Sequence, residues 1–272
     1  MTIALLQTAD RGSESENLMD VLEKIRDAGR EGAKIAVLPE LCLHPYLTRR
    51  RMEDERFWMG EDTLILDPLQ KAAQDWSMVV VMGVAWKLFG HHYNGALVID
   101  ENGRLEGCVP MAHRLPGGPY DGREIEAGAG EFKVFSTGAG PLGVLVGDDL
   151  MYCESPRILA LHGAQLIVAL GVPWALSYDA MLAQMKAYAC QNGVYVAYVN
   201  RAGEEADFVF GGGSALIDPE GYVTAQAAGA PQSLYGRIHP ERSHQVRTRL
   251  PFLDNRKCQG YLPLIQNLVR EA

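Results

Sequence analysis

Short apolar runs alternate along this chain with longer segments in which apolar residues recur every three or four positions. A short apolar run between turn residues is typical of a buried strand, and the longer spacing is typical of one helix face. In the first half, the predicted strands are 3–7, 34–38 and 78–86, and the predicted helices are 18–28 and 65–76. Ser13 and Glu16 resemble a capping box at the start of the first helix. Asn102-Gly103 predicts a hairpin at 96–107, because that dipeptide suits a turn with positive φ.

The second half repeats this order of elements. Its predicted strands are 143–146, 166–170 and 194–199, its helices cover 158–161 and 181–189, and its hairpin is 215–223. Helices between strands imply parallel pairing, with one helical layer on each sheet. Two such sheets packed face to face predict an α/β fold, a four-layer α-β-β-α sandwich with two pseudo-repeated halves. We expect a single domain at 1–243 and an Arg-rich C-terminal arm at 244–272 that packs on a partner subunit.

The composition and charge of the chain argue against some classes of binding partner. The chain has 272 residues and a net charge of −9, and no run of basic residues interrupts the acidic excess. Binding to nucleic-acid phosphates or to an anionic membrane surface is therefore not expected. The longest apolar stretches, 79–86 and 166–176, are too short to span a bilayer. Five well-separated cysteines fit neither a disulfide framework nor a zinc site, so we expect a reduced, cytoplasmic protein.

Several chemically capable residues follow the predicted strands. Ligands of parallel sheets bind beyond the carboxyl ends of the strands. Glu40 follows the second strand, the segment 112–114 follows the first hairpin, Gly147 and Asp148 follow the strand at 143–146, and Trp174 follows the strand at 166–170. These groups come from separate segments, and we expect them to converge on one pocket that takes a small molecule.

This arrangement resembles the nitrilase superfamily, the thiol-dependent carbon–nitrogen hydrolases. The resemblance covers about residues 1–260, and the order and spacing of six segments carry it. These segments are VLPELCLHPY, NGALVIDENGRLEG, LPGGPYDGREIEAG, LGVLVGDDLMYCESPRILALHGAQLIV, VYVAYVNRAG and GGSALIDPEGYV. The resemblance implies the four-layer sandwich, an ancestral amide hydrolysis, and a homodimer or a higher homo-oligomer. It implies no cofactor.

The resemblance also implies a catalytic set of a glutamate base, a lysine, a cysteine nucleophile and a second glutamate. The base falls on Glu40 and the second acidic position on Asp121. The cysteine position falls on Gly147, and an ungapped alignment places the lysine position at Ala112. Glycine has no side chain, so Gly147 cannot form the family's covalent intermediate. The chain thus departs from the family at the two residues that perform the covalent chemistry.

The residues next to these positions leave alternatives open. His113 and Arg114 could pair with Glu40, since an unpaired buried carboxylate is costly, or they could be an ordinary loop histidine and a surface arginine. Asp148 and Asp149 could suggest a metal site, but no paired histidines accompany them, and the resemblance implies that the second aspartate binds local backbone. No metal is expected.

Three further residues have two interpretations each. Tyr46 and Trp174 are candidate walls of the pocket, or plain core aromatics. Cys153 stands at a predicted helix start, where a thiol pKa is lowered, so it could be a displaced nucleophile. A small buried thiol fits that position equally well.

Three functional hypotheses follow from these residues. The first is a catalytically degenerate member of the superfamily that binds a small amide- or carboxylate-like ligand or a partner. The second is an enzyme that uses Glu40 as an acid–base group in a non-covalent hydrolysis, dehydration or cyclisation. The third is an ordinary amidase whose cysteine and lysine were replaced artificially, which would require two separate substitutions.

Overall fold

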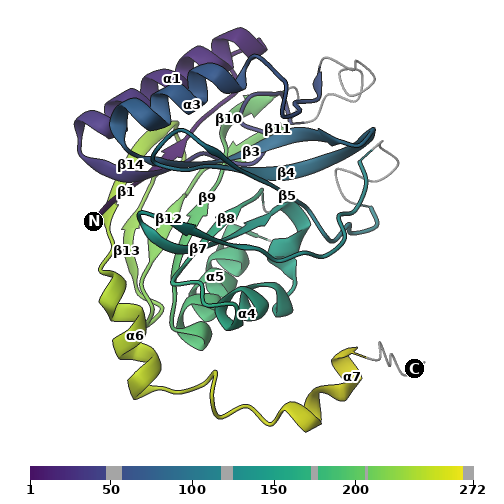
Figure 1. Cartoon of the computed structure of the whole chain (residues 1–272), viewed down its shortest axis with the longest axis vertical. Helices are drawn as coiled ribbons and strands as arrows, with labels where there is room; N and C mark the ends of the chain where they lie inside the picture. Colours follow the sequence, from purple (N-terminus) through teal and green to yellow (C-terminus); the bar gives the residue numbers. More distant parts are fainter. Residues whose placement is uncertain (47–56, 118–124, 173–176, 206–207, 266–272) are drawn as a thin grey trace.

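The fold was analysed in a computed structural model, which describes residues 1–46, 57–117, 125–172, 177–205 and 208–265. Two six-stranded sheets form its centre (Figure 1). The first sheet has the order β14-β1-β2-β3-β4-β5, with β1, β2 and β3 parallel. Its elements are β1 Thr2–Gln7, α1 Glu14–Arg30, β2 Ala33–Val37, α3 Leu66–Trp76, β3 Val79–Leu88, β4 His91–Ile99, β5 Leu105–Pro110 and β14 Gln232–Arg237.

The second sheet repeats this plan with the order β13-β12-β9-β8-β7-β6. Its central strands β7, β8 and β9 are parallel. Its elements are β6 Val134–Thr137, β7 Gly140–Val146, α4 Glu154–Leu161, β8 Leu166–Leu170, α5 Tyr178–Asn192, β9 Tyr195–Val199, β12 Ala215–Ile217 and β13 Val223–Gln226. Both expected hairpins are present, as β4–β5 and β12–β13, and a small hairpin of β10 Ala202–Glu205 and β11 Phe208–Gly211 follows β9.

Three apolar clusters separate the four layers. One lies between the two sheets and includes Ile3, Val98 and Val144. A second joins the first sheet to α1 and α3, and a third joins the second sheet to α4 and α5. Figure 1 shows α1 and α3 on one outer side and α4 and α5 on the other. The four-layer α-β-β-α sandwich expected from the sequence is therefore confirmed.

Local signals in the sequence set the ends of the first helix and the first hairpin. The Ser13 hydroxyl accepts a hydrogen bond from the Glu16 amide, so Ser13 is the N-cap, and it donates one of 2.6 Å to the Glu16 carboxylate, which in a full capping box would accept from the Ser13 amide instead. Gly103 adopts a φ of +80° in the β4–β5 turn. Asp100 stabilises that turn by accepting from the amides of Asn102 and Arg104. These contacts fix the start of α1 and the turn that leads from β4 into β5.

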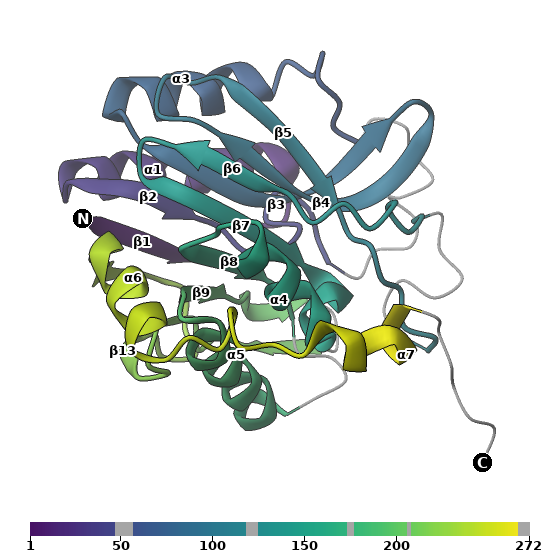
Figure 2. The same cartoon turned by 60° about the horizontal axis from the view of Figure 1, so that its bottom comes forward.

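The C-terminal region begins as a packed helix. Helix α6, Pro240–Arg249, buries Val246, and its Arg247 donates to the backbone oxygens of Ala164 and Asn192. The expected boundary between 243 and 244 falls inside this helix. The chain then continues through two short helical turns, η3 Cys258–Tyr261 and α7 Leu262–Ile265, which lie outside the sandwich (Figure 2).

The described part of the chain contains no helix of the length and apolar character needed to cross a membrane.

Candidate functional site

Glu40 lies at the centre of the candidate site, just beyond the end of β2. Its side chain is completely buried. Its Oε1 accepts a 2.6 Å hydrogen bond from Asn94 Nδ2 on β4, and its Oε2 accepts a 3.1 Å bond from the Val172 amide after β8. Both sheets thus contribute donors to one carboxylate. Two N–H donors on two oxygens suit an ionised carboxyl group.

A buried ion pair holds the backbone of the Glu40 turn. Arg201 donates from its guanidinium to the carbonyl oxygens of Leu41, at 2.6 Å, and Glu40, at 3.2 Å. Glu205 pairs with the same guanidinium and accepts a 2.6 Å bond from the Tyr46 amide. Leu41 adopts a φ of +48°, which is unusual for a residue with a side chain. Arg201 therefore fixes an uncommon backbone turn that sets the position of Glu40.

Tyr46 belongs to the same packed region. Its side chain is 1% exposed and contacts the Phe210 ring edge-on at 5.5 Å. The Arg201 guanidinium lies 6.0 Å from the Tyr46 ring. This places the tyrosine behind the Glu40 turn, in the core between the sheets. A direct contact of Tyr46 with a ligand stays a prediction.

Gly147 directly follows β7 and lies next to Glu40, which follows β2 of the other sheet. It adopts a φ of +58° and opens the short helical turn η2, Gly147–Met151. A Cβ atom placed on Gly147 would lie 3.1 Å from Glu40 Oε1, 2.9 Å from Asn94 Nδ2 and only 2.5 Å from the sulfur of Met111. Glu40 and Gly147 are therefore neighbours, as the strand-end argument requires, but the space for a side chain at position 147 is occupied.

Met111 is the residue that reaches into this space. It is fully buried, and its Sδ accepts weak hydrogen bonds from the Asp148 amide, at 3.3 Å, and from Asn94 Nδ2, at 3.7 Å. The next residue, Ala112, contacts Asp149 through its backbone amide. In an extended segment, neighbouring side chains point to opposite sides. The side chain beside Glu40 thus comes from position 111, not from position 112, where the ungapped alignment places the lysine.

Asp149 and Asp148 hold the 112–115 segment against the turn η2. Asp149 is 2% exposed and accepts hydrogen bonds from the amides of Ala112 and His113 and from His113 Nδ1, the last at 2.7 Å. Asp148 accepts a 2.9 Å bond from the Leu115 amide. The implied role of the second aspartate, binding local backbone, agrees with these contacts. Among the described residues, no group of three His, Cys, Asp or Glu side chains is arranged to hold a metal ion.

The His113 side chain pairs with Asp149 and not with Glu40. Its ring pairs with Asp149 and stacks on Tyr152 at a centroid distance of 3.7 Å. The interpretation in which His113 pairs with Glu40 is therefore wrong, because the Asp149 carboxylate offers a closer partner on the adjoining turn. Arg114 is half-buried in the same segment, and its pairing with Glu40 stays a prediction.

A match to a known protein family agrees with this fold and with the position of Glu40. The family model described as carbon–nitrogen hydrolase matches residues 2–248. The chain belongs to the carbon–nitrogen hydrolase family. Curated relatives include the omega-amidase NIT2 of Bos taurus, which is 28% identical over 95% of this chain and 96% of its own. A nitrilase of Pyrococcus abyssi is 31% identical over 75% of this chain and 76% of its own.

Solved structures show the same architecture. A carbon–nitrogen hydrolase from Helicobacter pylori G27 superposes with a TM-score of 0.89 at 24% identity, covering 98% of both chains. An amidase from Nesterenkonia sp. gives a TM-score of 0.82 at 24% identity, covering 99% of this chain and 96% of its own. At these identities the likeness establishes the fold alone.

The family model and the curated relatives show that the relatives of this chain are amidases and other hydrolases of the nitrilase superfamily.

Two expected members of the site, Asp121 and Trp174, lie outside the described residues. Their part in this carbon–nitrogen hydrolase site stays a prediction.

Cys153 lies at the start of α4, at the N-cap position, and its part as a displaced nucleophile stays a prediction. It is exposed, so the expectation of a small buried thiol is wrong. Partial burial raises the pKa of its thiol above the usual value, and the Glu154 carboxylate, which accepts from the sulfur at 3.4 Å, raises it further. The nearby carboxylate outweighs the lowering expected from a helix start. Burial also raises the pKa of Cys42, to about 12.

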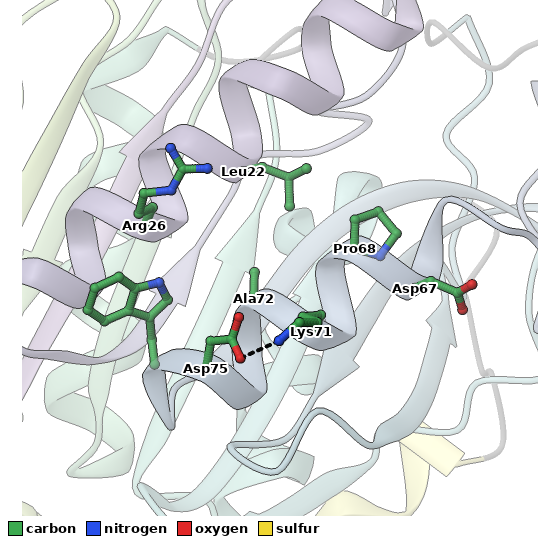
Figure 3. A pocket seen from close by; sticks show the side chains of 8 residues that line it. Leu22, Arg26, Asp67, Pro68, Lys71, Ala72 and Asp75 are labelled. Carbon is green, nitrogen blue, oxygen red and sulfur yellow. Dashed lines mark hydrogen bonds and ion pairs between the residues drawn. The ribbon is translucent and has the colours of Figure 1, made fainter.

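A groove on the molecular surface lies far from this chemistry. It runs between α1 and α3 on the outer face of their layer, as Figure 3 shows, and the Lys71–Asp75 ion pair of 2.6 Å bridges successive turns of α3 there. Its lining residues are Leu22, Arg26, Asp67, Pro68, Lys71, Ala72, Asp75 and Trp76. Because the first sheet separates this groove from Glu40, we assign it no part in the site.

Sequence reasoning missed three residues of the site: Asn94, Met111 and Arg201. The sequence could have pointed to Asn94 and Arg201, since each is a polar residue at an end of an otherwise apolar run. In the structure both side chains are fully buried. Met111 carried no such signal, because a methionine beside a strand is usually plain core.

Proposed function

We propose that this chain binds a small amide- or carboxylate-like ligand at Glu40 and performs no thiol-dependent amide hydrolysis. The observation that supports the proposal is the pairing of Gly147 with Met111. Position 147 has no nucleophile. The Met111 sulfur lies only 2.5 Å from the place that the Cβ of a cysteine at position 147 would take, so it occupies the space that this side chain would need. Without a thiol, no acyl-enzyme or thioimidate can form at this position.

We further propose that the family's lysine position corresponds to Met111 and not to Ala112. A lysine that pairs with the glutamate must point at it, and of positions 111 and 112 it is Met111 whose side chain contacts the groups around Glu40. The site has then exchanged a cation for a neutral thioether. Because the nucleophile and the cation act together in covalent catalysis, losing either one costs many powers of ten in rate.

Glu40 keeps a second function possible, that of an acid–base group for a non-covalent reaction. The carboxylate is intact, buried and oriented by Asn94 and Val172, which is the preparation that a general base requires. The hypothesis of an artificially inactivated amidase receives less support. It would require the return of a cysteine at position 147 together with a different residue at 111.

The proposal is tested by ligand titration of the full chain, with calorimetry as the readout. Small aliphatic amides and the matching carboxylates are the probes. We expect saturable binding of the amides to wild type, and a loss of at least about tenfold in their affinity for Glu40→Gln, because the neutral glutamine side chain cannot accept an N–H as strongly as the carboxylate does. The exposed Glu204→Gln serves as the matched control and should bind as wild type does. Equal affinity for wild type and Glu40→Gln would contradict a site at Glu40.

We also propose that the chain forms a homodimer or a higher homo-oligomer through α4, α5 and the C-terminal segment. The segment after α6 exposes Phe252, Leu262 and Leu264, each at more than half of its surface. Exposed apolar side chains of this size gain free energy when a partner covers them. Light scattering at micromolar concentration should give at least a dimer for the full chain and a smaller mass for a chain ending at residue 249. A monomeric full chain would contradict the proposal.

We propose that the protein resides in the cytoplasm, which is a reducing compartment, and the state of its cysteines supports this. All five are free thiols, and two of them, Cys153 and Cys258, are exposed. Exposed free thiols persist only where the surroundings keep them reduced. Cell fractionation that found the protein in an oxidising compartment would contradict this.

A further inference from the structure

Met111 satisfies two N–H donors of the site with a poor acceptor. Its Sδ takes the Asp148 amide at 3.3 Å and Asn94 Nδ2 at 3.7 Å. A thioether sulfur is a weak hydrogen-bond acceptor, whereas an amide oxygen at this place would be a strong one. All three residues are almost completely buried, so water does not compensate the weak bonds. The sulfur therefore occupies a position in which an oxygen atom would be bound more strongly.

The opposite side of the same space carries an acceptor. Glu40 Oε1 lies 3.1 Å from the Cβ position of Gly147, and the Met111 sulfur lies 2.5 Å from it. Two donors and one carboxylate oxygen thus surround one small volume beside a residue with no side chain. A primary carboxamide has the complementary groups, because its oxygen accepts from both donors while its N–H donates to Glu40.

A carboxylate of the same shape fits this set less well. It has no N–H to donate, and it brings a second negative charge to within hydrogen-bond range of Glu40. Like charges this close repel strongly in a buried site. The geometry therefore distinguishes the amide from its acid.

We propose that Met111 is a displaceable plug that determines the ligand specificity of the Glu40 site. In the absence of ligand its thioether takes the place of a carbonyl oxygen, and a primary carboxamide displaces it. Methionine is suited to this because its unbranched side chain has other rotamers to adopt, and the cost of leaving this one opposes ligand binding. This inference rests on the proposed function, in which the site binds amides without hydrolysing them.

Butyramide and butyrate are the probes, and calorimetry on the full chain gives both dissociation constants. Met111→Ala removes the plug and should bind butyramide at least about tenfold more tightly than wild type, since displacement no longer opposes binding. Met111→Leu keeps the volume, loses the sulfur and is stiffer, so it should bind more weakly than wild type. Butyrate should bind Met111→Ala at least about tenfold more weakly than butyramide.

Two further variants keep the test decisive. Met185→Ala truncates another fully buried methionine, in the third apolar cluster, and should leave butyramide binding as in wild type. Met111→Val shortens the plug less and should give an intermediate affinity if Met111→Ala does not fold. The inference is overturned if removing the plug leaves the affinity unchanged, if butyrate binds as well as butyramide, or if no variant binds butyramide.

Ammonia release, followed in the same samples, separates this inference from the proposed function. Ammonia from wild type would contradict the proposed function and leave the comparison of affinities intact. Unchanged affinities without ammonia would overturn only the role of Met111.

Discussion

The sulfur of Met111 stands 2.5 Å from the point at which a side chain on Gly147 would begin. This contact joins the end of β5 to the end of β7, and therefore one sheet of the sandwich to the other. It fills the space at position 147, where the resemblance to the family places the nucleophile.

Gly147→Ala should reduce the free energy of unfolding by about 2–5 kcal/mol. Overpacking against Met111 costs about 1–3 kcal/mol, and the left-handed backbone at position 147 adds about 1–2 kcal/mol for a residue with a Cβ. Urea denaturation measures the change. Gly211→Ala is the matched control, because a Cβ there meets no atom within 4 Å, and it should cost far less.

The double variant Gly147→Ala with Met111→Ala tests the contact itself. Removing the sulfur makes room for the new methyl group, so the two changes should couple by at least about 1 kcal/mol in the stabilising direction. Strictly additive effects would show that Met111 does not occupy this space.

Asp149→Ala should destabilise the protein by about 2–4 kcal/mol, because several N–H donors of the 112–113 segment lose their acceptor. His113→Gln, which removes one of these bonds, should cost about 1 kcal/mol. Denaturant unfolding of both variants gives the comparison. If Asp149→Ala costs no more than His113→Gln, the carboxylate does not anchor the segment as described.

Cys153 should react with iodoacetamide through a pH profile that is still rising at pH 9. Burial and the Glu154 carboxylate both favour the neutral thiol, so its pKa is raised above the usual value and the reactive thiolate is scarcer than for an unperturbed cysteine. The measurement uses Cys258→Ser, because Cys258 is the other exposed thiol. Glu154→Gln removes the negative charge and should move the profile to lower pH. A plateau reached below pH 8 in the parent would contradict this assignment.

The sequence predicted the sandwich because its two periodicities are strong and repeat in both halves. Buried strands and amphipathic helices depend on residue type alone, as at 166–170 and 181–189. Glu40 and Gly147 were also placed correctly as neighbours, since the ends of parallel strands meet at one edge of a sheet.

The orientation of single side chains was not accessible in the same way. A shift of one residue in an extended segment exchanges its two faces. One gap in the alignment therefore moves the expected lysine position from Ala112 to Met111, whose side chain lies on the other face. His113 depended on Asp149, which is 36 residues distant in the chain. Such contacts come from tertiary packing, and no local sequence pattern predicts them.

The central claim is that no thiol of this protein forms a covalent intermediate with an amide. The most direct test is the intact mass of the full chain during incubation with butyramide and with ω-amides, with ammonia release measured in parallel. We predict an unchanged mass and no ammonia above the buffer rate. An adduct on a cysteine, with turnover lost in Cys153→Ser, would contradict the claim by showing that the nucleophile has moved. Turnover that survives Cys153→Ser without an adduct and disappears in Glu40→Gln would instead contradict the proposed binding role and establish a non-covalent hydrolase.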